Sequence, residues 1–99
     1  MTLSNFTHVA DMGFTRAELL KGLTTAVFPY QVVNLNTDMI EIVDEDRMVR
    51  LTTGKDGFRA IASMQVPKLS VQLEFINFDQ DQYERFMQRF RKYLHKGGG

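Results

Sequence analysis

The chain has 99 residues, which is room for one domain with one hydrophobic core, and its 12 basic residues balance its 12 acidic residues. It has no cysteine, which excludes disulfides, thiolate catalysis and cysteine-based zinc sites. No apolar run approaches the ~18 residues of a membrane span, and the amino terminus does not resemble a signal peptide. We therefore expect a cytoplasmic protein with a single domain over residues 1–99, in which residues 96–99 form a flexible glycine tail.

Residues 15–28 carry the signals of a first helix. Thr15 is a favourable N-cap, and Glu18, three positions later, can complete a capping box by accepting a hydrogen bond from the backbone N–H of Thr15. Apolar residues then recur along one face, and Pro29 prevents the helix from continuing. Gly22 lowers the helix propensity, so we expect it to mark a close approach between this helix and the sheet.

The hydrophobic period changes to two after this helix, which predicts strands. The clearest strand is residues 68–75, where apolar and polar side chains alternate. Further runs of strand length cover residues 30–35, 39–43, 47–53 and 58–65, and another strand could cover residues 3–10. Turn-forming residues at 36–38, 44–47, 54–57 and 66–68 separate these runs. Because connections this short join antiparallel strands, we predict an antiparallel meander.

A long amphipathic helix is predicted to follow the last strand. Asp79 is its expected N-cap, and Gln82 closes a second capping box. Large apolar side chains then repeat at helical spacing and form a stripe that we expect to be buried: Tyr83, Phe86, Met87, Phe90 and Leu94. Gly97 falls where a helix that ends at His95 or Lys96 would need a residue with positive φ, so it fits a C-cap.

These elements predict an α+β domain of two layers, in the order (β)-α-β-β-β-β-β-α. We expect an antiparallel sheet of about five or six strands, arranged as a meander, with both helices on one face. The element order is similar to that of small helix-grip folds, in which a long C-terminal helix lies across a curved antiparallel sheet. That resemblance implies space for a hydrophobic ligand between the sheet and the last helix.

Catalytic chemistry has little support in the sequence. The two histidines, His8 and His95, lie near opposite ends, and no nucleophile elbow, zinc-protease, P-loop or dinucleotide-binding motif occurs. Asp38, Glu41 and the acidic turn at 44–46 lack the ligand spacing and the glycine of a calcium loop. We therefore predict no enzymatic activity, no cofactor and no metal site.

A basic face on the last helix is a candidate for binding. Arg85, Arg89, Lys92 and Lys96 recur at helical spacing, with no acidic residue between them. Such a face could bind an acidic partner, nucleic acid or an anionic membrane surface. The sequence pI of about 6.7 and the core-like spacing of the aromatic residues argue against nucleic acid. Cations near a helix C-terminus also complement the helix dipole, so we favour a face that is only solvated.

Phenylalanine, tyrosine and methionine are abundant, which leaves several interpretations for the apolar residues. The stripe on the last helix, together with Phe75, could line a ligand pocket. A chain this short could instead need the whole set as core, which is the interpretation we favour. Excess apolar surface could also be buried in a homodimer.

The last two glycines allow one further role. Gly98 and Gly99 are not needed for a C-cap, and a free glycine tail is what an adenylating enzyme could activate in a carrier protein. Familiar carriers of that kind resemble β-grasp domains, whose glycines follow a strand, whereas these glycines follow a predicted helix. We therefore expect them to end the chain without a chemical role.

The function that we expect is that of a small non-enzymatic binding module. It would self-associate or dock a protein partner through the sheet edge or the last helix. The alternative is a binder of small hydrophobic ligands, with its pocket between the sheet and the last helix. A carrier protein activated at its C-terminal glycines ranks third, and an enzyme ranks last.

Overall fold

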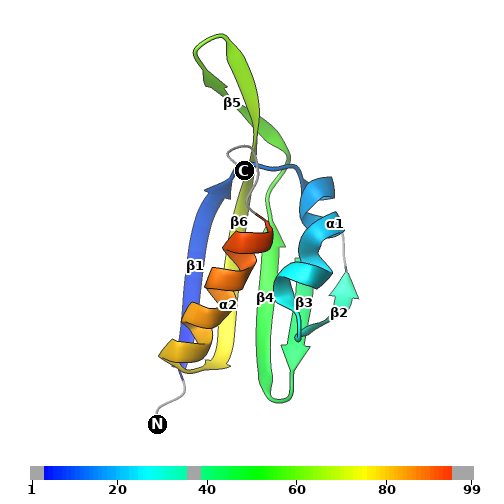
Figure 1. The fold of residues 1–99 in the computed structure, drawn as a ribbon, viewed down its shortest axis with the longest axis vertical. Helices are drawn as coiled ribbons and strands as arrows, with labels where there is room; N and C mark the ends of the chain where they lie inside the picture. Colours follow the sequence, from blue (N-terminus) through cyan, green and yellow to red (C-terminus); the bar gives the residue numbers. More distant parts are fainter. Residues whose placement is uncertain (1–3, 36–38, 95–99) are drawn as a thin grey trace.

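The computed structural model describes residues 4–35 and 39–94 of the chain (Figure 1). Its elements, in chain order, are β1 (Ser4–Met12), α1 (Arg16–Val27), β2 (Gln31–Leu35), β3 (Met39–Asp44), β4 (Arg47–Thr53), β5 (Gly57–Ile61), β6 (Met64–Phe78) and α2 (Gln80–Tyr93). The α+β class, the order of the elements and the additional strand near the start of the chain are confirmed. The glycine tail expected at 96–99 lies outside the described residues. Within the described ranges, neither helix has the length and apolar character that a membrane span requires.

The described strands form an antiparallel sheet that is a meander only in part. Neighbouring strands follow the order β1-β6-β4-β3-β2, and β5 pairs with β6 off this path (Figure 1). Strands β2, β3 and β4 form the expected meander. The 15 residues of β6 extend well beyond its pairing with β5, so the rest of this strand lies between β4 and β1. The meander therefore does not continue beyond β4.

The turn between β5 and β6 differs from the prediction. It lies at Ala62 and Ser63, inside the single strand predicted for residues 58–65, while the turn predicted at 66–68 belongs to β6. Pro67 is tolerated in β6 because the strand pairs with β5 alone at this point, so no second ladder needs its missing N–H. Strand β5 and the paired part of β6 form an arm that extends beyond the rest of the sheet (Figure 1). We call residues 57–68 the β5–β6 arm.

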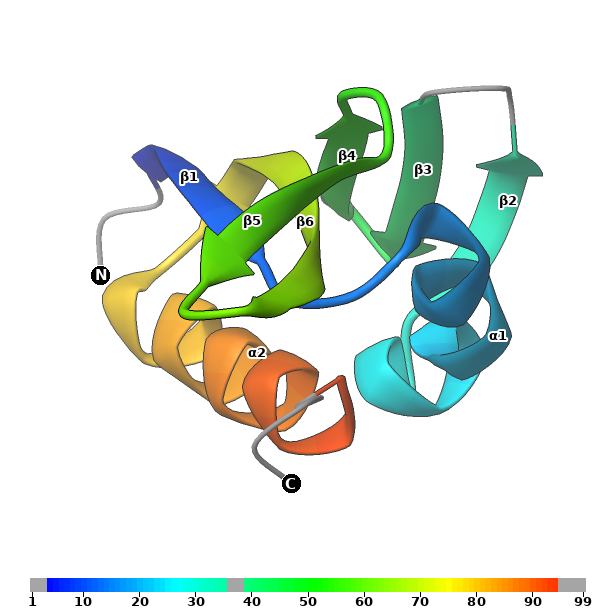
Figure 2. The ribbon, with the colours of Figure 1, turned by 90° about the horizontal axis from the view of Figure 1, so that it is seen from above.

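Both helices cover the same face of the sheet, as predicted (Figure 2). Alternate residues of the central strands are buried on that side: Ile40, Ile42, Val49, Leu51, Leu69, Val71, Leu73 and Phe75. The stripe of α2 packs against them, since Phe86, Met87, Phe90 and the following Leu94 are buried and Tyr83 is partly buried. The core therefore lies between this face and the two helices.

Local capping bonds position both helices as the sequence predicts. Thr15 Oγ1 accepts from the backbone N–H of Glu18 at 3.1 Å, and Glu18 Oε1 accepts from the N–H of Thr15 at 2.9 Å. Asp79 and Gln82 form the same reciprocal pair at the start of α2, with distances of 2.8 and 3.0 Å. These bonds satisfy backbone donors that would otherwise be unpaired at the helix ends.

The two helices also contact each other through the glycine of α1. A Cβ atom at Gly22 would lie 2.9 Å from Leu94 Cδ2, just after the end of α2. The close approach expected at this glycine is therefore made to the end of α2 and not to the sheet. The reason is that α1 lies beside α2 on the same face of the sheet (Figure 2).

Candidate functional site

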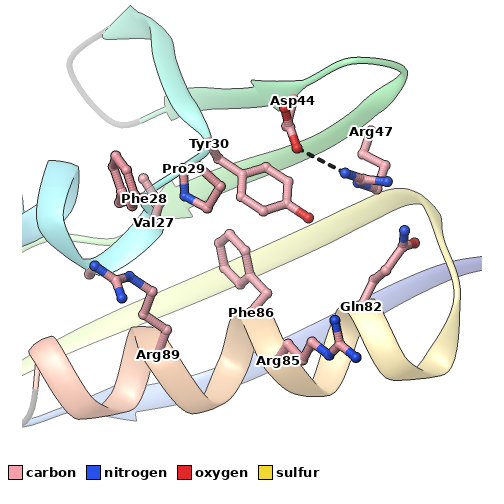
Figure 3. Close-up of a pocket in the computed structure, with 11 residues that line it drawn as sticks. Val27, Phe28, Pro29, Tyr30, Asp44, Arg47, Gln82, Arg85, Phe86 and Arg89 are labelled. Carbon is pink, nitrogen blue, oxygen red and sulfur yellow. Dashed lines mark hydrogen bonds and ion pairs between the residues drawn. The ribbon is translucent and has the colours of Figure 1, made fainter.

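An open pocket of about 500 Å³ lies between the end of α1, the turn that joins β3 to β4, and one side of α2 (Figure 3). Its lining comes from separate parts of the chain: Ala26, Val27, Phe28, Pro29, Tyr30, Asp44, Arg47, Gln82, Arg85, Phe86 and Arg89. The volume is in the range of about 300–1,000 Å³ that is typical of small-molecule sites. The lining divides into an apolar floor and a rim of hydrogen-bond donors.

Aromatic residues and Pro29 build the apolar floor. Pro29 follows the end of α1 and precedes β2, and the next residue, Tyr30, lies beside Phe86 of α2 (Figure 3). The Tyr30 ring meets Phe86 edge to face at a centroid distance of 5.4 Å and is stacked with Phe78 at 5.8 Å. These contacts hold the Tyr30 ring and leave its hydroxyl pointing toward Arg47 (Figure 3).

Arg47 approaches the pocket from the hairpin between β3 and β4. Its Nη2 donates to Asp44 Oδ2 at 2.8 Å, and its guanidinium carbon lies 5.7 Å from the centre of the Tyr30 ring. The side chain is 21% exposed, and its buried Nε has no hydrogen-bond partner among the described residues. A partly buried guanidinium with spare donors favours an anion in the pocket.

Burial and the ion pair together affect the protonation of Tyr30 and Arg47. Burial raises the pKa of Tyr30 above its ordinary value of 10.0, although the neighbouring Arg47 acts in the opposite direction. Burial alone would lower the pKa of Arg47, but its interactions with Asp44 and Tyr30 raise it overall. At neutral pH the pocket therefore presents a protonated phenol and a charged guanidinium, and both can donate hydrogen bonds.

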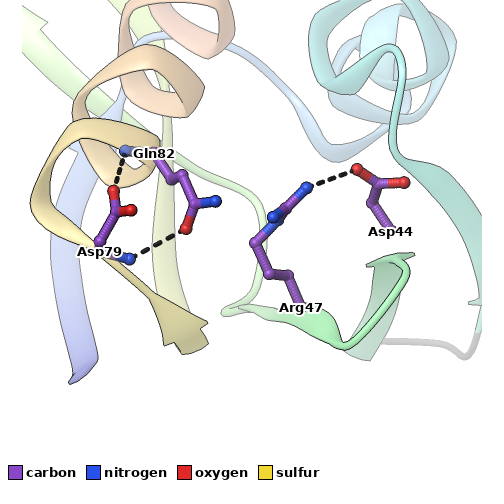
Figure 4. A network of polar contacts seen from close by, with 4 residues as sticks. All are labelled: Asp44, Arg47, Asp79 and Gln82. Carbon is purple, nitrogen blue, oxygen red and sulfur yellow. Dashed lines mark hydrogen bonds and ion pairs between the residues drawn. The ribbon is translucent and has the colours of Figure 1, made fainter. Parts of the chain in front are cut away.

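Gln82 has a fixed orientation because it belongs to the capping box of α2. Its Oε1 accepts from the backbone N–H of Asp79 at 3.0 Å, and its own backbone N–H donates to Asp79 Oδ1 at 2.8 Å. The Nε2 amide is therefore turned away from the cap and toward Arg47 (Figure 4). The helix cap thereby holds one more donor at the rim of the pocket.

Two arginines on successive turns of α2 complete the rim. Arg85 Nη2 lies 2.9 Å from Asp81 Oδ2, and both side chains are strongly exposed. Arg89 Nε donates to the carbonyl of Thr25 at 3.0 Å, and its guanidinium carbon lies 5.6 Å from the centre of the Phe28 ring. Each guanidinium carries several N–H donors, so both arginines retain donors after these contacts.

The pocket is cationic on balance. Among its described lining residues, three arginines face one carboxylate, and that carboxylate, Asp44, is already paired with Arg47. Guanidinium groups match the geometry of carboxylates and phosphates, while the aromatic floor can cover apolar surface. The arrangement therefore suits a ligand that combines an anionic group with an apolar body.

The structure brings part of the predicted basic face to this pocket. Arg85 and Arg89 line it, and Lys92 lies about one turn further along α2. Lys96 lies outside the described residues. The face that we expected to be only solvated therefore borders a pocket on one side.

Sequence reasoning misses the opposite side of the pocket, which Phe28, Tyr30 and Arg47 form. Phe28 and Tyr30 flank the proline that ends α1, and Arg47 follows an acidic turn, so none of them carries a local binding signal. They meet because β2 pairs with β3 and β3 pairs with β4, which places the start of β2 beside the β3–β4 turn. A contact of this kind depends on strand pairing and cannot be read from residue spacing.

The six apolar residues predicted as pocket or core all belong to the core or pack against it. They are Phe75, Tyr83, Phe86, Met87, Phe90 and Leu94, and all but the partly buried Tyr83 are buried. Phe86 also lines the pocket, while Phe90 and Leu94 border a smaller depression of about 210 Å³ beside Gly13. The pocket thus lies at the edge of the layer between the sheet and α2.

The other candidate residues do not form a second cluster in the part of the chain that the structure describes. His8 Nδ1 lies 3.5 Å from the hydroxyl of Tyr83, and burial, with a contribution from Arg91, lowers the pKa of His8 below its ordinary 6.5. Within 4–35 and 39–94, no three His, Asp or Glu side chains are grouped to hold a metal ion. Residues that lie outside these ranges are Asp38, His95, Gly97, Gly98 and Gly99.

Comparisons of this chain with protein-family models, curated proteins and solved structures found no match. The candidate site therefore rests on the geometry, charge and accessibility of the chain's own residues. Among the described residues, the pocket beside α2 combines space, cations and an apolar floor.

Proposed function

We propose that this protein is a small non-enzymatic binding module whose site is the pocket beside α2. One observation carries the proposal: among the described residues, three arginines, one paired carboxylate and an aromatic floor surround about 500 Å³ of open space. Sites of this kind bury the apolar part of a ligand and orient it with a few polar groups. The ligand is therefore a carboxylate or phosphate carried on an apolar body.

A purely hydrophobic ligand suits the site less well than such an anion. It would cover the Tyr30 hydroxyl and the Arg47 guanidinium without accepting their hydrogen bonds. An unpaired buried donor costs about 1–3 kcal/mol, and more when it is charged. The proposal thus differs from the expected binder of hydrophobic ligands in the charge of the ligand and in the position of the pocket.

A cytoplasmic location is part of the proposal. The absence of cysteine in the sequence is compatible with a reducing compartment, where disulfides do not contribute to stability. The alternative of an activated carrier rests on Gly98 and Gly99 alone. Deletion of both glycines should leave ligand binding unchanged if the pocket is the functional site.

Titration of isotope-labelled protein, followed by NMR, tests the proposal. The probes are phenyl phosphate, inorganic phosphate as the bare anion, and benzyl alcohol as the neutral analogue. We expect phenyl phosphate to shift the amide signals of Tyr30, Arg47, Gln82 and Arg89 at a lower concentration than either control. If all three probes leave these signals unchanged at millimolar concentration, the proposal is wrong.

A matched pair of variants separates the site from the general charge of the helix. Arg85→Gln removes a cation from the rim, and the lost exposed pair with Asp81 costs about 0.5 kcal/mol or less. Arg91→Gln removes the same charge from α2, but Arg91 does not line the pocket. We expect phenyl phosphate to bind about fivefold more weakly to Arg85→Gln and equally well to Arg91→Gln. If both variants bind phenyl phosphate equally more weakly than the wild type, the ligand is attracted by the general charge of α2 and not by the pocket.

Self-association is a second candidate function, and the β5–β6 arm favours it. Phe58, Ile61 and Met64 are large apolar residues exposed on this projecting arm (Figure 1). Exposed apolar groups on a strand that has an open edge are typical of surfaces that pair with another chain. Sedimentation velocity should therefore show a dimer that Phe58→Ser and Met64→Ser together convert to a monomer. A wild-type monomer at all accessible concentrations would exclude this role.

A further inference from the structure

A second, shallow depression of about 240 Å³ lies next to the pocket along α2. The second depression is lined by Arg85, Gln88, Arg89, Lys92 and Tyr93, so it shares two arginines with the pocket. We call the combined surface the basic trough and define it by Phe28, Tyr30, Arg47, Gln82, Arg85, Arg89, Lys92 and Tyr93. It extends from the β3–β4 turn to the last turn of α2.

Aromatic rings and cations are in contact along the basic trough. The guanidinium carbon of Arg89 lies 5.6 Å from the centre of the Phe28 ring and 4.5 Å from that of Tyr93. Lys92 Nζ lies 5.4 Å from the same Tyr93 ring. Both rings are accessible, since Phe28 is 63% and Tyr93 43% exposed. These contacts restrain long cationic side chains before a partner binds, which lowers the entropic cost of binding.

We propose that the occupant of the basic trough is an acidic segment of a partner protein, bound in an extended conformation with one large apolar side chain on the aromatic floor of the pocket and a neighbouring carboxylate at the donors of Tyr30 and Arg47. This inference rests on the proposed function, because the apolar side chain uses the same pocket. Charge complementarity identifies the partner. Among the described residues that line the two depressions, there are four cations and one carboxylate, Asp44, which is already paired with Arg47. Arg85 is also paired, with Asp81 outside the lining, so Arg89 and Lys92 contribute most of the uncompensated positive charge.

The spacing of the cations on α2 fits an extended chain. Arg85, Arg89 and Lys92 are four and three residues apart, which corresponds to about 6 Å and about 4.5 Å along the helix axis. Alternate residues of an extended chain are about 6.6 Å apart and point to the same side. Carboxylates at alternate positions can therefore reach neighbouring cations of the trough while a nearby apolar residue enters the pocket.

The dimensions and contacts of the trough favour a peptide segment over other anions. From Arg85 to Lys92 it extends about 10 Å along α2, which is more than one small anionic group needs. Single-stranded nucleic acid binds through bases stacked on free aromatic faces. Here the Phe28 and Tyr93 rings already carry Arg89 and Lys92, so fewer faces are free for bases.

Fluorescence anisotropy with a labelled synthetic peptide tests this inference on the full chain. The parent peptide has glutamate at alternate positions and one phenylalanine. Two control versions are compared with it: in one, glutamine replaces each glutamate, and in the other, serine replaces the phenylalanine. We expect the parent peptide to bind about tenfold more tightly than either version. At about 0.15 M salt, where exposed charges are screened over about 8 Å, Lys92→Glu should weaken peptide binding about tenfold and phenyl phosphate binding much less, because Lys92 does not line the pocket.

Arg91→Glu is the matched control, since it reverses a charge on α2 outside the basic trough and should leave both affinities unchanged. Two results would overturn the inference while the proposed function stands, provided that phenyl phosphate binds. One is a peptide that binds no more tightly than its two versions, and the other is a peptide affinity that Lys92→Glu does not change. If neither phenyl phosphate nor the peptide binds, both are overturned. Tighter binding of a labelled oligothymidylate, with the same dependence on Lys92, would overturn the inference in favour of nucleic acid.

Discussion

Gln82 is the single residue that links the fold most closely to the proposed site. Its Oε1 closes the capping box of α2, and its Nε2 points toward Arg47 at the rim of the pocket (Figure 4). The capping role can be predicted from Asp79, three positions earlier in the sequence. The role at the rim cannot, because Arg47 reaches the same place only after the strands have paired.

The variant Gln82→Glu should separate these two roles. Glutamate also closes a capping box, so we expect the free energy of unfolding to change by less than about 0.5 kcal/mol. Its carboxylate would lie at the rim beside Arg47 and repel an anionic ligand, so the Kd for phenyl phosphate should rise about tenfold. Isothermal titration calorimetry measures the affinity, and urea unfolding measures the stability.

Gln82→Ala is the control for this pair of measurements, because alanine supplies neither the cap nor the donor. It should lose about 1 kcal/mol of stability as well as affinity. An unchanged affinity in Gln82→Glu would contradict the placement of the ligand's anionic group beside this residue.

His8 should make the stability of the protein depend on pH. Burial, with a contribution from Arg91, lowers the pKa of His8 in the folded state below its ordinary 6.5, so the unfolded chain takes up a proton first as the pH falls. The free energy of unfolding should therefore decrease as the pH falls from about 6.5 through the lowered pKa of the folded state. His8→Gln should remove this part of the dependence in urea unfolding between about pH 7.5 and about pH 5.5. The same pH dependence in the variant and in the wild type would contradict this role.

Among the structural elements, the two helices are predicted best because their signals are local. Each capping box joins residues only three positions apart, and both are confirmed. The β5–β6 turn is predicted in the wrong place because Ala62 and Ser63 have no strong turn signal, whereas Pro67 suggests a break. The position of β6 between β1 and β4 is not predicted, since period-two alternation shows which side of a strand is buried but not which strands are its neighbours.

Ala62→Gly should stabilise the β5–β6 turn. Ala62 has φ 54, in the left-handed region, where a residue with a Cβ is disfavoured by roughly 1 kcal/mol relative to glycine. The greater freedom of glycine in the unfolded chain offsets part of this gain, so we expect an increase of at most about 1 kcal/mol. Ser63→Gly is the control, because Ser63 does not have a positive φ and should gain nothing. Urea unfolding that shows a larger loss for Ala62→Gly than for Ser63→Gly would contradict the turn position.

The proposed site is a property of the whole molecule rather than of one motif. Its apolar floor and cationic rim come from the end of α1, the start of β2, the β3–β4 turn and α2 (Figure 3). The sequence shows the arginines of α2 as a basic face and a candidate for binding, because they recur on one helix, although we expected that face to be only solvated. It does not identify Tyr30 and Arg47, whose position beside that helix results from sheet order and from the packing of both helices on one face.

Ionic strength should affect ligand binding more than it affects folding. Exposed charges are screened over about 10 Å at about 0.1 M salt, whereas the core is apolar and unaffected by such screening. We expect phenyl phosphate to bind about threefold to tenfold more weakly when sodium chloride rises from about 0.02 M to about 0.5 M. The midpoint of thermal unfolding should not fall over the same range. Binding that does not depend on salt would show that the arginine rim contributes little.

The placement of a ligand in the pocket beside α2 is tested most directly by intermolecular nuclear Overhauser effects between phenyl phosphate and the labelled protein. We predict contacts from the phenyl protons to the methyl groups of Val27 and the ring of Phe86, and their loss when Arg85 and Arg89 are both replaced by glutamine. Two results together would contradict this placement. Phenyl phosphate would show contacts only to the β5–β6 arm or to the outer face of the sheet, and it would bind the double variant with the same affinity as the wild type.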